Sequence, residues 1–199
     1  MMMKMARPLA AMIGAAVVLT AFSGAGQAAE AYVENIRADV VPQVRSWISN
    51  PVVIAAIKSQ NEKHAGLTQS DIENMDKQWR SETSAGGGKL IDAVLGNSVS
   101  AYLGGIKNDG KGVYTEIFVM DSRGLNVGQS DVTSDYWQGD EAKWQKTYRR
   151  GADGLLIDEV EFDESTQTFQ SQLSLSVVDP EDGAVIGAVT VGVNVDMLQ

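Results

Sequence analysis

Four aromatic side chains gather in the segment DYWQGDEAKWQKTY, residues 135–148, although aromatic residues make up only 7% of the chain. Trp144 and Tyr148 are four residues apart, so on a helix they share one face. That spacing is as typical of core packing as it is of a pocket wall. Tyr136 and Trp137 precede this helix in a loop, where aromatic side chains with polar tips favour contact with a ligand.

Charged side chains beside these rings could recognise the polar groups of a ligand. Lys143 directly precedes Trp144 and could pair with an anionic group, or it could simply be solvated. Arg149 and Arg150 could hold a carboxylate in a bidentate manner, but Gly151 directly after them favours a turn. A lysine beside aromatic rings favours a small carboxylate as the ligand.

The familiar catalytic constellations fail on inspection. His64 is the only histidine and the chain contains no cysteine, so the usual zinc sites, cysteine nucleophiles and disulfides are excluded. No serine lies in a GxSxG sequence. We expect His64 to be a solvated side chain, and the acidic stretch 157–165, IDEVEFDES, to be a solvated strand edge. An enzyme is therefore the weaker functional class.

The first 28 residues have the layout of a cleaved signal peptide. Lys4 and Arg7 precede an apolar stretch, residues 9–22, and small residues follow it. The apolar stretch is shorter than the roughly 20 residues of a membrane helix, so we expect cleavage and a periplasmic protein. The formal net charge is −10, and loss of Lys4 and Arg7 lowers it to −12. Nucleic acid and anionic membrane surfaces are therefore poor partners.

The elements that must position the candidate residues form two parts of one domain, residues 29–199. In the helical part, 30–104, apolar residues recur every three or four positions, Pro42 should interrupt the first helix, and Ser70 with Glu73 predicts a capping box. In the sheet-containing part, 112–197, apolar residues alternate and predict five strands. The sequence therefore predicts an α+β fold, with N-terminal helices packed on a five-stranded antiparallel sheet.

The order of several motifs resembles that of the Cache family of extracellular, PAS-like sensor domains. These motifs are a strand ending in Asp121 with Gly124 after it, a second strand ending in Ser130, the aromatic segment 135–148, and a final hairpin with Asp182-Gly183 and Ile186-Gly187. The helical sequence NPVVIAAI and the pair Asp76 and Trp79 also look like that family. The resemblance covers residues 30 to 199.

The resemblance implies a PAS-like sheet and a sensor domain that binds a small organic ligand. In that family the pocket lies between the sheet and the segment joining the second and third strands. The candidate ligand-binding residues are therefore Tyr136, Trp137, Lys143, Trp144, Tyr148 and Asp158. The resemblance suggests Asp158 as the acceptor for an amine, so an amino acid, a carboxylate and an amine all remain open as ligands. We expect no cofactor and no metal, and a homodimer formed through the N-terminal helix remains open.

The sequence closes with NVDMLQ, and we expect no output module of its own. We therefore expect a stand-alone sensor domain that acts with a membrane receptor, kinase or cyclase. One alternative is a periplasmic interaction protein whose pocket is filled by its own side chains. A less favoured alternative is a hydrolase that uses the acidic strand edge.

Overall fold

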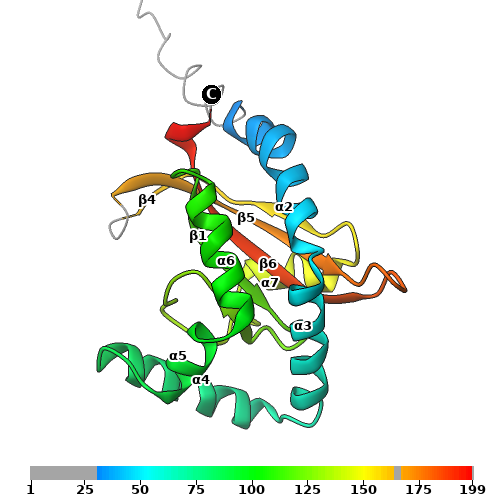
Figure 1. Ribbon diagram of the computed structural model, residues 1–199, viewed down its shortest axis with the longest axis vertical. Helices are drawn as coiled ribbons and strands as arrows, with labels where there is room; N and C mark the ends of the chain where they lie inside the picture. Colours follow the sequence, from blue (N-terminus) through cyan, green and yellow to red (C-terminus); the bar gives the residue numbers. More distant parts are fainter. Residues whose placement is uncertain (1–30, 164–166, 199) are drawn as a thin grey trace, which may run out of the picture.

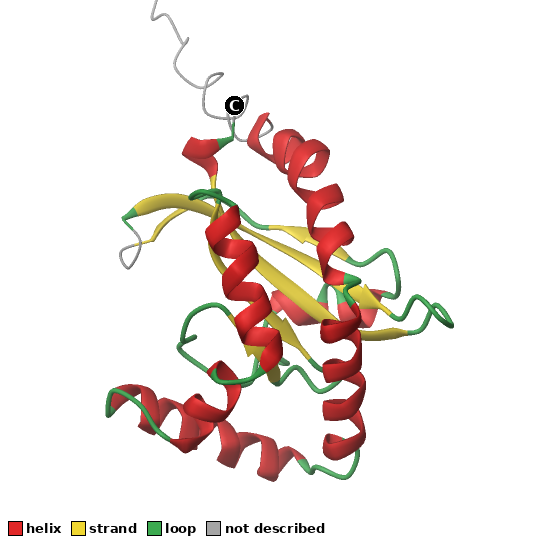
Figure 2. Cartoon of the chain, viewed as in Figure 1, coloured by secondary structure: helices red, strands yellow, loops and turns green. Residues whose placement is uncertain are grey.

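The computed structural model describes residues 31–163 and 167–198, which form helices followed by one antiparallel sheet (Figure 1, Figure 2). The predicted α+β fold class is thus confirmed. The predicted signal peptide, residues 1–28, lies outside the described residues. None of the helices formed by the described residues has the length and apolar character that a membrane crossing requires.

The described residues of the N-terminal part of the chain are mainly helical. Residues 31–35 are helical and continue into η1 (Ile36–Val40) and α2 (Val41–Ile48), and these are followed by α3 (Pro51–His64), α4 (Gln69–Ser84), α5 (Lys89–Leu95) and α6 (Ser98–Asp109). The segment η1 is π-helical and ends two residues before Pro42, so a widened turn accommodates the proline and the chain stays helical. The predicted interruption at Pro42 is therefore a change of helix type.

The helix starts show which local signals succeeded. Asn50 caps α3 by accepting a hydrogen bond from the backbone N–H of Val52 at 2.9 Å. The capping box of α4 is formed by Thr68 and Asp71, so the predicted pair Ser70 and Glu73 is wrong by two residues. Thr68 provides the same chemistry two residues earlier, where the extended backbone of a helix cap is found.

The sheet contains β1 (Tyr114–Met120), β2 (Asn126–Gln129), β3 (Leu155–Ile157), β4 (Glu161–Asp163), β5 (Thr168–Val178) and β6 (Val185–Asn194). The order is β2-β1-β6-β5-β3, all pairs are antiparallel, and β4 pairs with β5 beyond β3. The predicted third strand is thus two short strands on the same edge of β5. The long hairpin of β5 and β6 was predicted and places Leu173 opposite Val191.

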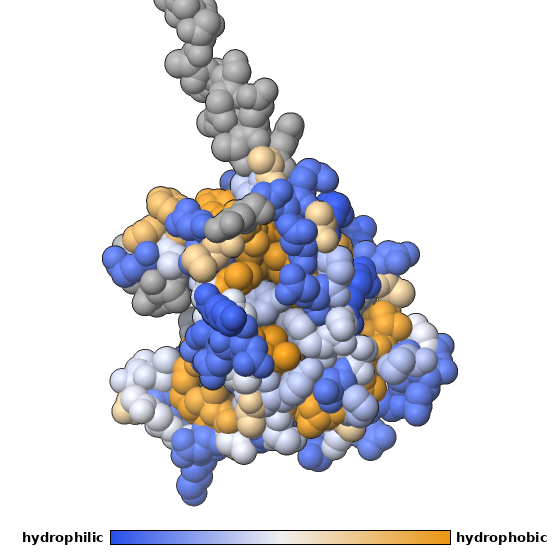
Figure 3. Space-filling view, turned by 45° about the horizontal axis from the view of Figure 1, so that its top comes forward, coloured by the Kyte–Doolittle hydropathy of each residue, from blue (hydrophilic) through white to orange (hydrophobic). Residues whose placement is uncertain are grey.

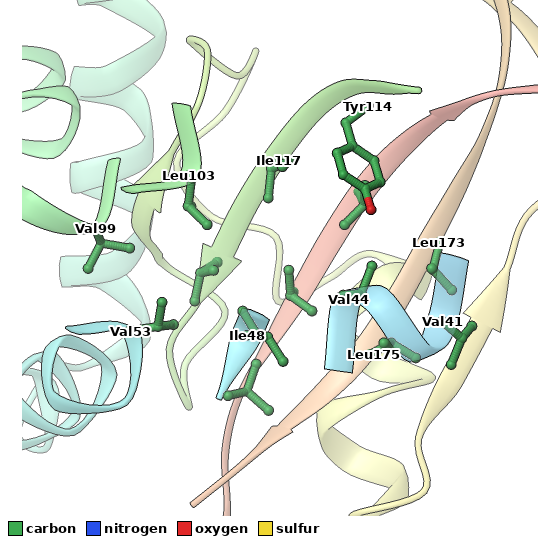
Figure 4. Packing of buried hydrophobic residues seen from close by; sticks show 14 of the residues in the cluster. Val41, Val44, Ile48, Val53, Val99, Leu103, Tyr114, Ile117, Leu173 and Leu175 are labelled. Carbon is green, nitrogen blue, oxygen red and sulfur yellow. The ribbon is translucent and has the colours of Figure 1, made fainter. Parts of the chain in front are cut away.

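One face of the sheet is covered by α2, α3 and α6, whereas α4 and α5 extend beyond the end of the sheet (Figure 1). Most strand residues in this core are odd-numbered, and Ile117, Leu175 and Val189 are at most 1% exposed. Figure 4 shows helical side chains such as Val44 pointing toward them. Each such buried side chain contributes about 1.5–3 kcal/mol. At the surface, hydrophobic groups lie in patches between hydrophilic ones (Figure 3).

The opposite face of the sheet, called the outer face below, is covered by the segment that joins β2 to β3. This segment contains α7 (Ala142–Gln145) and η2 (Tyr148–Arg150), and the chain closes with η3 (Val195–Met197). On the outer face, Trp144 of α7 packs on Phe118, Met120 and Ala188. The sheet therefore lies between α2, α3 and α6 on one side and α7 with η2 on the other, whereas the loop before α7 contacts α4.

Candidate functional site

Tyr136 lies in the interior of the protein and forms part of its packing. It is 3% exposed and stacks on Trp79 of α4, with ring centroids 5.4 Å apart and planes 22° apart. Burial raises the pKa of its phenol well above the usual value, and the nearby Asp121 carboxylate adds to this effect. Tyr136 therefore stabilises the loop before α7 by packing in the interior.

Asp76 fastens the loop that carries Tyr136 and Trp137 to helix α4. Its Oδ1 accepts hydrogen bonds from the backbone N–H groups of Tyr136 and Trp137, at 3.0 and 3.1 Å. Its Oδ2 accepts from Nε of Arg80 at 2.7 Å, and Arg80 also reaches Asp135 at 3.2 Å. Trp79 adds a hydrogen bond from its indole N–H to the carbonyl of Thr133. The motif with Asp76 and Trp79 thus positions the aromatic segment.

The turn between β1 and β2 orients both tryptophans of the segment. The indole N–H of Trp137 donates to the carbonyl of Arg123 at 2.9 Å, and that of Trp144 donates to the carbonyl of Asp121 at 3.1 Å. The fully buried Asp121 carboxylate holds the turn, because its Oδ1 accepts from the backbone N–H groups of Arg123 and Leu125. The two indole rings are therefore fixed by one turn.

His64 also contacts this turn, and the expectation of a solvated side chain is wrong. Its Nδ1 lies 2.7 Å from Oδ2 of Asp121, and its side chain is 14% exposed. Gln60 donates to the same oxygen at 3.0 Å. The C-terminal end of α3 is thereby joined to the turn that orients Trp137 and Trp144, a contact that spans about sixty residues of sequence.

Gly124 allows the turn to approach the aromatic segment closely. Its φ is +82°, and a Cβ added there would lie 2.5 Å from Cα of Gly139. The backbone N–H of Gln138 donates to the carbonyl of Gly124 at 2.7 Å. A side chain at either glycine would separate the turn from the segment.

An open groove of about 420 Å³, called the aromatic groove below, lies where these parts meet. It is lined by Gln69, Ile72, Ser122, Arg123, Trp137, Gly139, Trp144, Tyr148 and Arg149. The rings of Trp144 and Tyr148 stack with centroids 5.0 Å apart, and the guanidinium of Arg149 lies 5.1 Å from the Trp144 ring. Three of the six candidate residues, Trp137, Trp144 and Tyr148, are therefore brought together.

Lys143 and Asp158 do not line the aromatic groove. Lys143 forms an ion pair with Glu141 at 2.9 Å and lies 5.5 Å from the ring of Phe118 on the outer face. Asp158 lines a separate hollow of about 310 Å³, together with Glu159, Glu161, Gln170 and Gln172. The two hollows share no lining residue, so the predicted acceptor for an amine lies apart from the rings.

Glu116 lies near the acidic hollow on the outer face. Burial raises the pKa of this carboxyl, while the positive charge of Lys143 and a hydrogen bond from Gln172 oppose the rise.

Within residues 31–163 and 167–198, no group of three or more histidine, aspartate or glutamate side chains is placed to hold a metal ion.

A buried cluster of amide side chains lies under the same segment and was not predicted. Nδ2 of Asn126 donates to Oε1 of Gln129 at 3.0 Å and to the carbonyl of Asp135, and Nε2 of Gln138 donates to that carbonyl as well. Three atoms of the cluster are buried and have no hydrogen-bond partner among the residues that the structure describes: Oδ1 of Asn126, Nε2 of Gln129 and Oε1 of Gln138. Buried polar groups normally have partners, so this cluster has the chemistry of an internal hydration site.

The sequence analysis did not identify Arg123 as a candidate binding residue, and it favoured a turn at Arg149. Both arginines line the aromatic groove, and both are exposed. Arg149 belongs to η2, five residues after Trp144, whereas Arg123 lies in the turn after β1. Neither position carried a local signal, because a spacing of five residues after Trp144 does not share a helical face, and Arg123 reaches the groove through the tertiary fold.

Comparison with known proteins gives similarity at the level of the fold. No family model matches the chain, and no curated protein matches it. The sensor domain of the V. cholerae histidine kinase DctB matches with a TM-score of 0.44 and 11% identity, covering 85% of this chain and 54% of that one. The ligand-binding domain of the Campylobacter jejuni chemoreceptor Tlp3, in complex with L-norvaline, matches with a TM-score of 0.46 and 14% identity, covering 87% and 57%.

The ligand-binding domain of the Pseudomonas aeruginosa PAO1 chemoreceptor PctC, in complex with GABA, matches with a TM-score of 0.38 and 13% identity, covering 87% of this chain and 64% of that one. This chain spans a little over half the length of the DctB and Tlp3 domains. These structures are a sensor domain of a histidine kinase and ligand-binding domains of chemoreceptors, and identities of 11–14% limit the similarity to the fold.

Proposed function

We propose that this protein is a periplasmic sensor domain that binds a small organic molecule in the aromatic groove. The observation that carries the proposal is the convergence of Trp137, Trp144 and Tyr148 on one open groove of about 420 Å³. Pockets for small molecules have volumes of about 300–1,000 Å³ and combine aromatic walls with a few polar groups. Binding, and not catalysis, is the function that this combination supports.

The hydrogen bonds of the two indole N–H groups support a preformed site. The indole N–H groups of Trp137 and Trp144 are both bonded to backbone carbonyls, so the two rings are held before a ligand arrives. A preformed site avoids the entropy cost of ordering side chains on binding. Tyr136 contributes from the interior, through its contact with Trp79.

A sensor must pass its bound state to another protein. In our proposal the chain acts as a stand-alone domain that docks on a membrane receptor, kinase or cyclase. The turn between β1 and β2 is the element that would respond, because it joins the groove to β1 and, through Asp121, to His64 of α3. Lys143 and Asp158 remain candidate contacts for a ligand that extends along the outer face.

A second candidate function is that of an interaction protein with a self-filled pocket. It is favoured by the packing of Trp144 on Phe118, Met120 and Ala188, because this ring occupies the space between the segment and the sheet. Such a protein would bind its partner without a small ligand.

A thermal-shift screen of the protein lacking residues 1–28 tests both candidates, with amino acids, organic acids and amines as probes. A ligand at 100 times its dissociation constant adds about 2.7 kcal/mol to the free energy of unfolding. For a domain of this size that corresponds to a rise in Tm of about 5–10 °C. A lack of response to every probe would favour the interaction protein.

Variants locate the site of any hit. Trp137→Ala should abolish the shift, whereas Phe162→Ala, which also removes an exposed ring, should leave it unchanged, because Phe162 lies in β4. Shifts that persist in the Trp137 variant would show that the ligand binds elsewhere.

A further inference from the structure

We propose that the aromatic groove selects an anionic small molecule, a carboxylate or a phosphate with a flat apolar part, over an amine. This inference rests on the proposed function and adds the chemical class of the ligand. It comes from two guanidinium groups, those of Arg123 and Arg149, which line the groove together with the rings.

The first observation is that these two arginines lack acidic partners in an acidic protein. The chain has a formal net charge of −10. Some other cations of the fold are paired, as in Lys58 with Asp179 at 2.6 Å and Lys107 with Asp131 at 2.7 Å. Among the residues that the structure describes, neither Arg123 nor Arg149 lies within ion-pair distance of a carboxylate.

The second observation is that the described residues lining the groove include no aspartate or glutamate. An ammonium group in the groove would face two positive charges without a compensating negative one. A carboxylate or phosphate there would face donors of the opposite charge, and guanidinium groups bind such oxygens in bidentate geometry.

The third observation concerns the remaining way to bind an amine, which is the face of an aromatic ring. Tyr148 stacks on Trp144, and the guanidinium of Arg149 already lies 5.1 Å from the Trp144 ring. Trp144 therefore already has a cation of the protein itself beside its ring. The carboxylates that could hold an amine, such as Asp158, line the separate acidic hollow.

Arg123 is also partly oriented for this role. One of its terminal nitrogens donates to the carbonyl of Ala65 at 2.8 Å, which anchors the guanidinium between the end of α3 and the groove. Of the five N–H donors of an arginine, the others stay free for a ligand. An anion can thus bind between Arg123 and Arg149 while its apolar part lies on Trp137.

The test uses matched probes that differ in charge and share a ring. Benzoate, phenyl phosphate and benzylamine are titrated into the protein lacking residues 1–28, and binding is measured by calorimetry. We expect at least one of the two anions to bind more tightly than benzylamine, and the comparison of benzoate with phenyl phosphate separates the two anion chemistries. Binding of the anion should weaken as the salt concentration rises, because screening reduces the attraction.

Variants assign the effect to the two arginines. Arg149→Gln and Arg123→Gln should each weaken anion binding by about tenfold or more, because each removes charge-assisted hydrogen bonds. Arg150→Gln is the matched control: this exposed neighbour does not line the groove and should leave binding unchanged. Both groove arginines are exposed, so the variants should fold with at most a small fall in Tm, from the lost contact of Arg123 with Ala65 or of Arg149 with Trp144.

The outcomes distinguish this inference from the proposed function. If benzylamine or other amines bind more tightly than the anions, and Trp137→Ala abolishes that binding, the anion inference is overturned while the groove remains a binding site. Anion binding that is as strong in both arginine variants as in the unaltered protein also overturns it. If no probe binds in a manner that depends on Trp137, the proposed function fails together with the inference.

Discussion

Replacement of Asp76 should release the loop that presents Trp137. The carboxylate accepts from two backbone N–H groups, at 3.0 and 3.1 Å, and it is 9% exposed. Hydrogen bonds to a charged group contribute about 1.5–3 kcal/mol each to stability. A buried N–H group that is left without an acceptor adds the cost of its lost hydration. The amide of Tyr136 is buried, whereas that of Trp137 can regain water, so we expect Asp76→Ala to cost about 3 kcal/mol.

The comparison with Asp76→Asn isolates the backbone contacts. Asparagine keeps one oxygen for the two N–H groups and loses the charge and the acceptor that face Arg80, whose side chain is 57% exposed. Exposed ion pairs contribute at most about 1 kcal/mol, so the asparagine variant should cost no more than that. Glu73→Ala on the same helix is the control, because Glu73 is exposed and bonds only weakly to Gln69.

Thermal and urea unfolding measure these differences. A cost of about 3 kcal/mol corresponds to a fall in Tm of about 6–12 °C for a domain of this size. The alanine variant should also bind groove ligands more weakly than the asparagine variant. Equal stability of Asp76→Ala and the unaltered protein, or equal damage by alanine and asparagine, would refute the reasoning.

Three further changes test other parts of the structure. Glu116→Gln should raise the Tm at pH 7 and have little effect below about pH 4. The reason is that burial raises the pKa of Glu116 in the folded state, so this carboxyl reduces stability as the pH rises above its usual pKa. A Tm benefit that grows at low pH would contradict this assignment. Gly187→Ala should cost about 1–3 kcal/mol in urea unfolding, because the added Cβ would overlap the carbonyl of Met120 in β1. A neutral effect would mean that β6 can shift away from β1. A high-resolution crystal structure should show ordered water bound to the free amide atoms of Asn126, Gln129 and Gln138, and a dry cluster there would oppose the hydration site.

The strand pattern was predictable because burial of one face requires alternation. The odd-numbered valines of β6 predicted a long strand with one face in the core, and the structure buries Val189, Val191 and Val193 completely. The split of the third strand into β3 and β4 was not predictable from propensity. Both strands pair with β5, and the acidic stretch between them has no apolar pattern that fixes where pairing stops.

The aromatic segment could be recognised from its composition, but not the roles within it. Tyr136 and Trp137 are neighbours in sequence, yet Tyr136 is buried against Trp79 and Trp137 lines the groove. Local sequence could not separate them, because α4 decides which ring points inward. His64 shows the same limit, since its partner Asp121 lies 57 residues away in the sequence.

Nuclear magnetic resonance of the tryptophan indole N–H groups tests the central claim most directly. The chain has four tryptophans, so four indole signals are expected. On titration with a ligand found by the thermal screen, the signals of Trp137 and Trp144 should shift most, and that of Trp47, which packs edge-on against Tyr114 in the main core, should not move. A saturating ligand that leaves Trp137 and Trp144 unshifted would contradict the aromatic groove as the binding site.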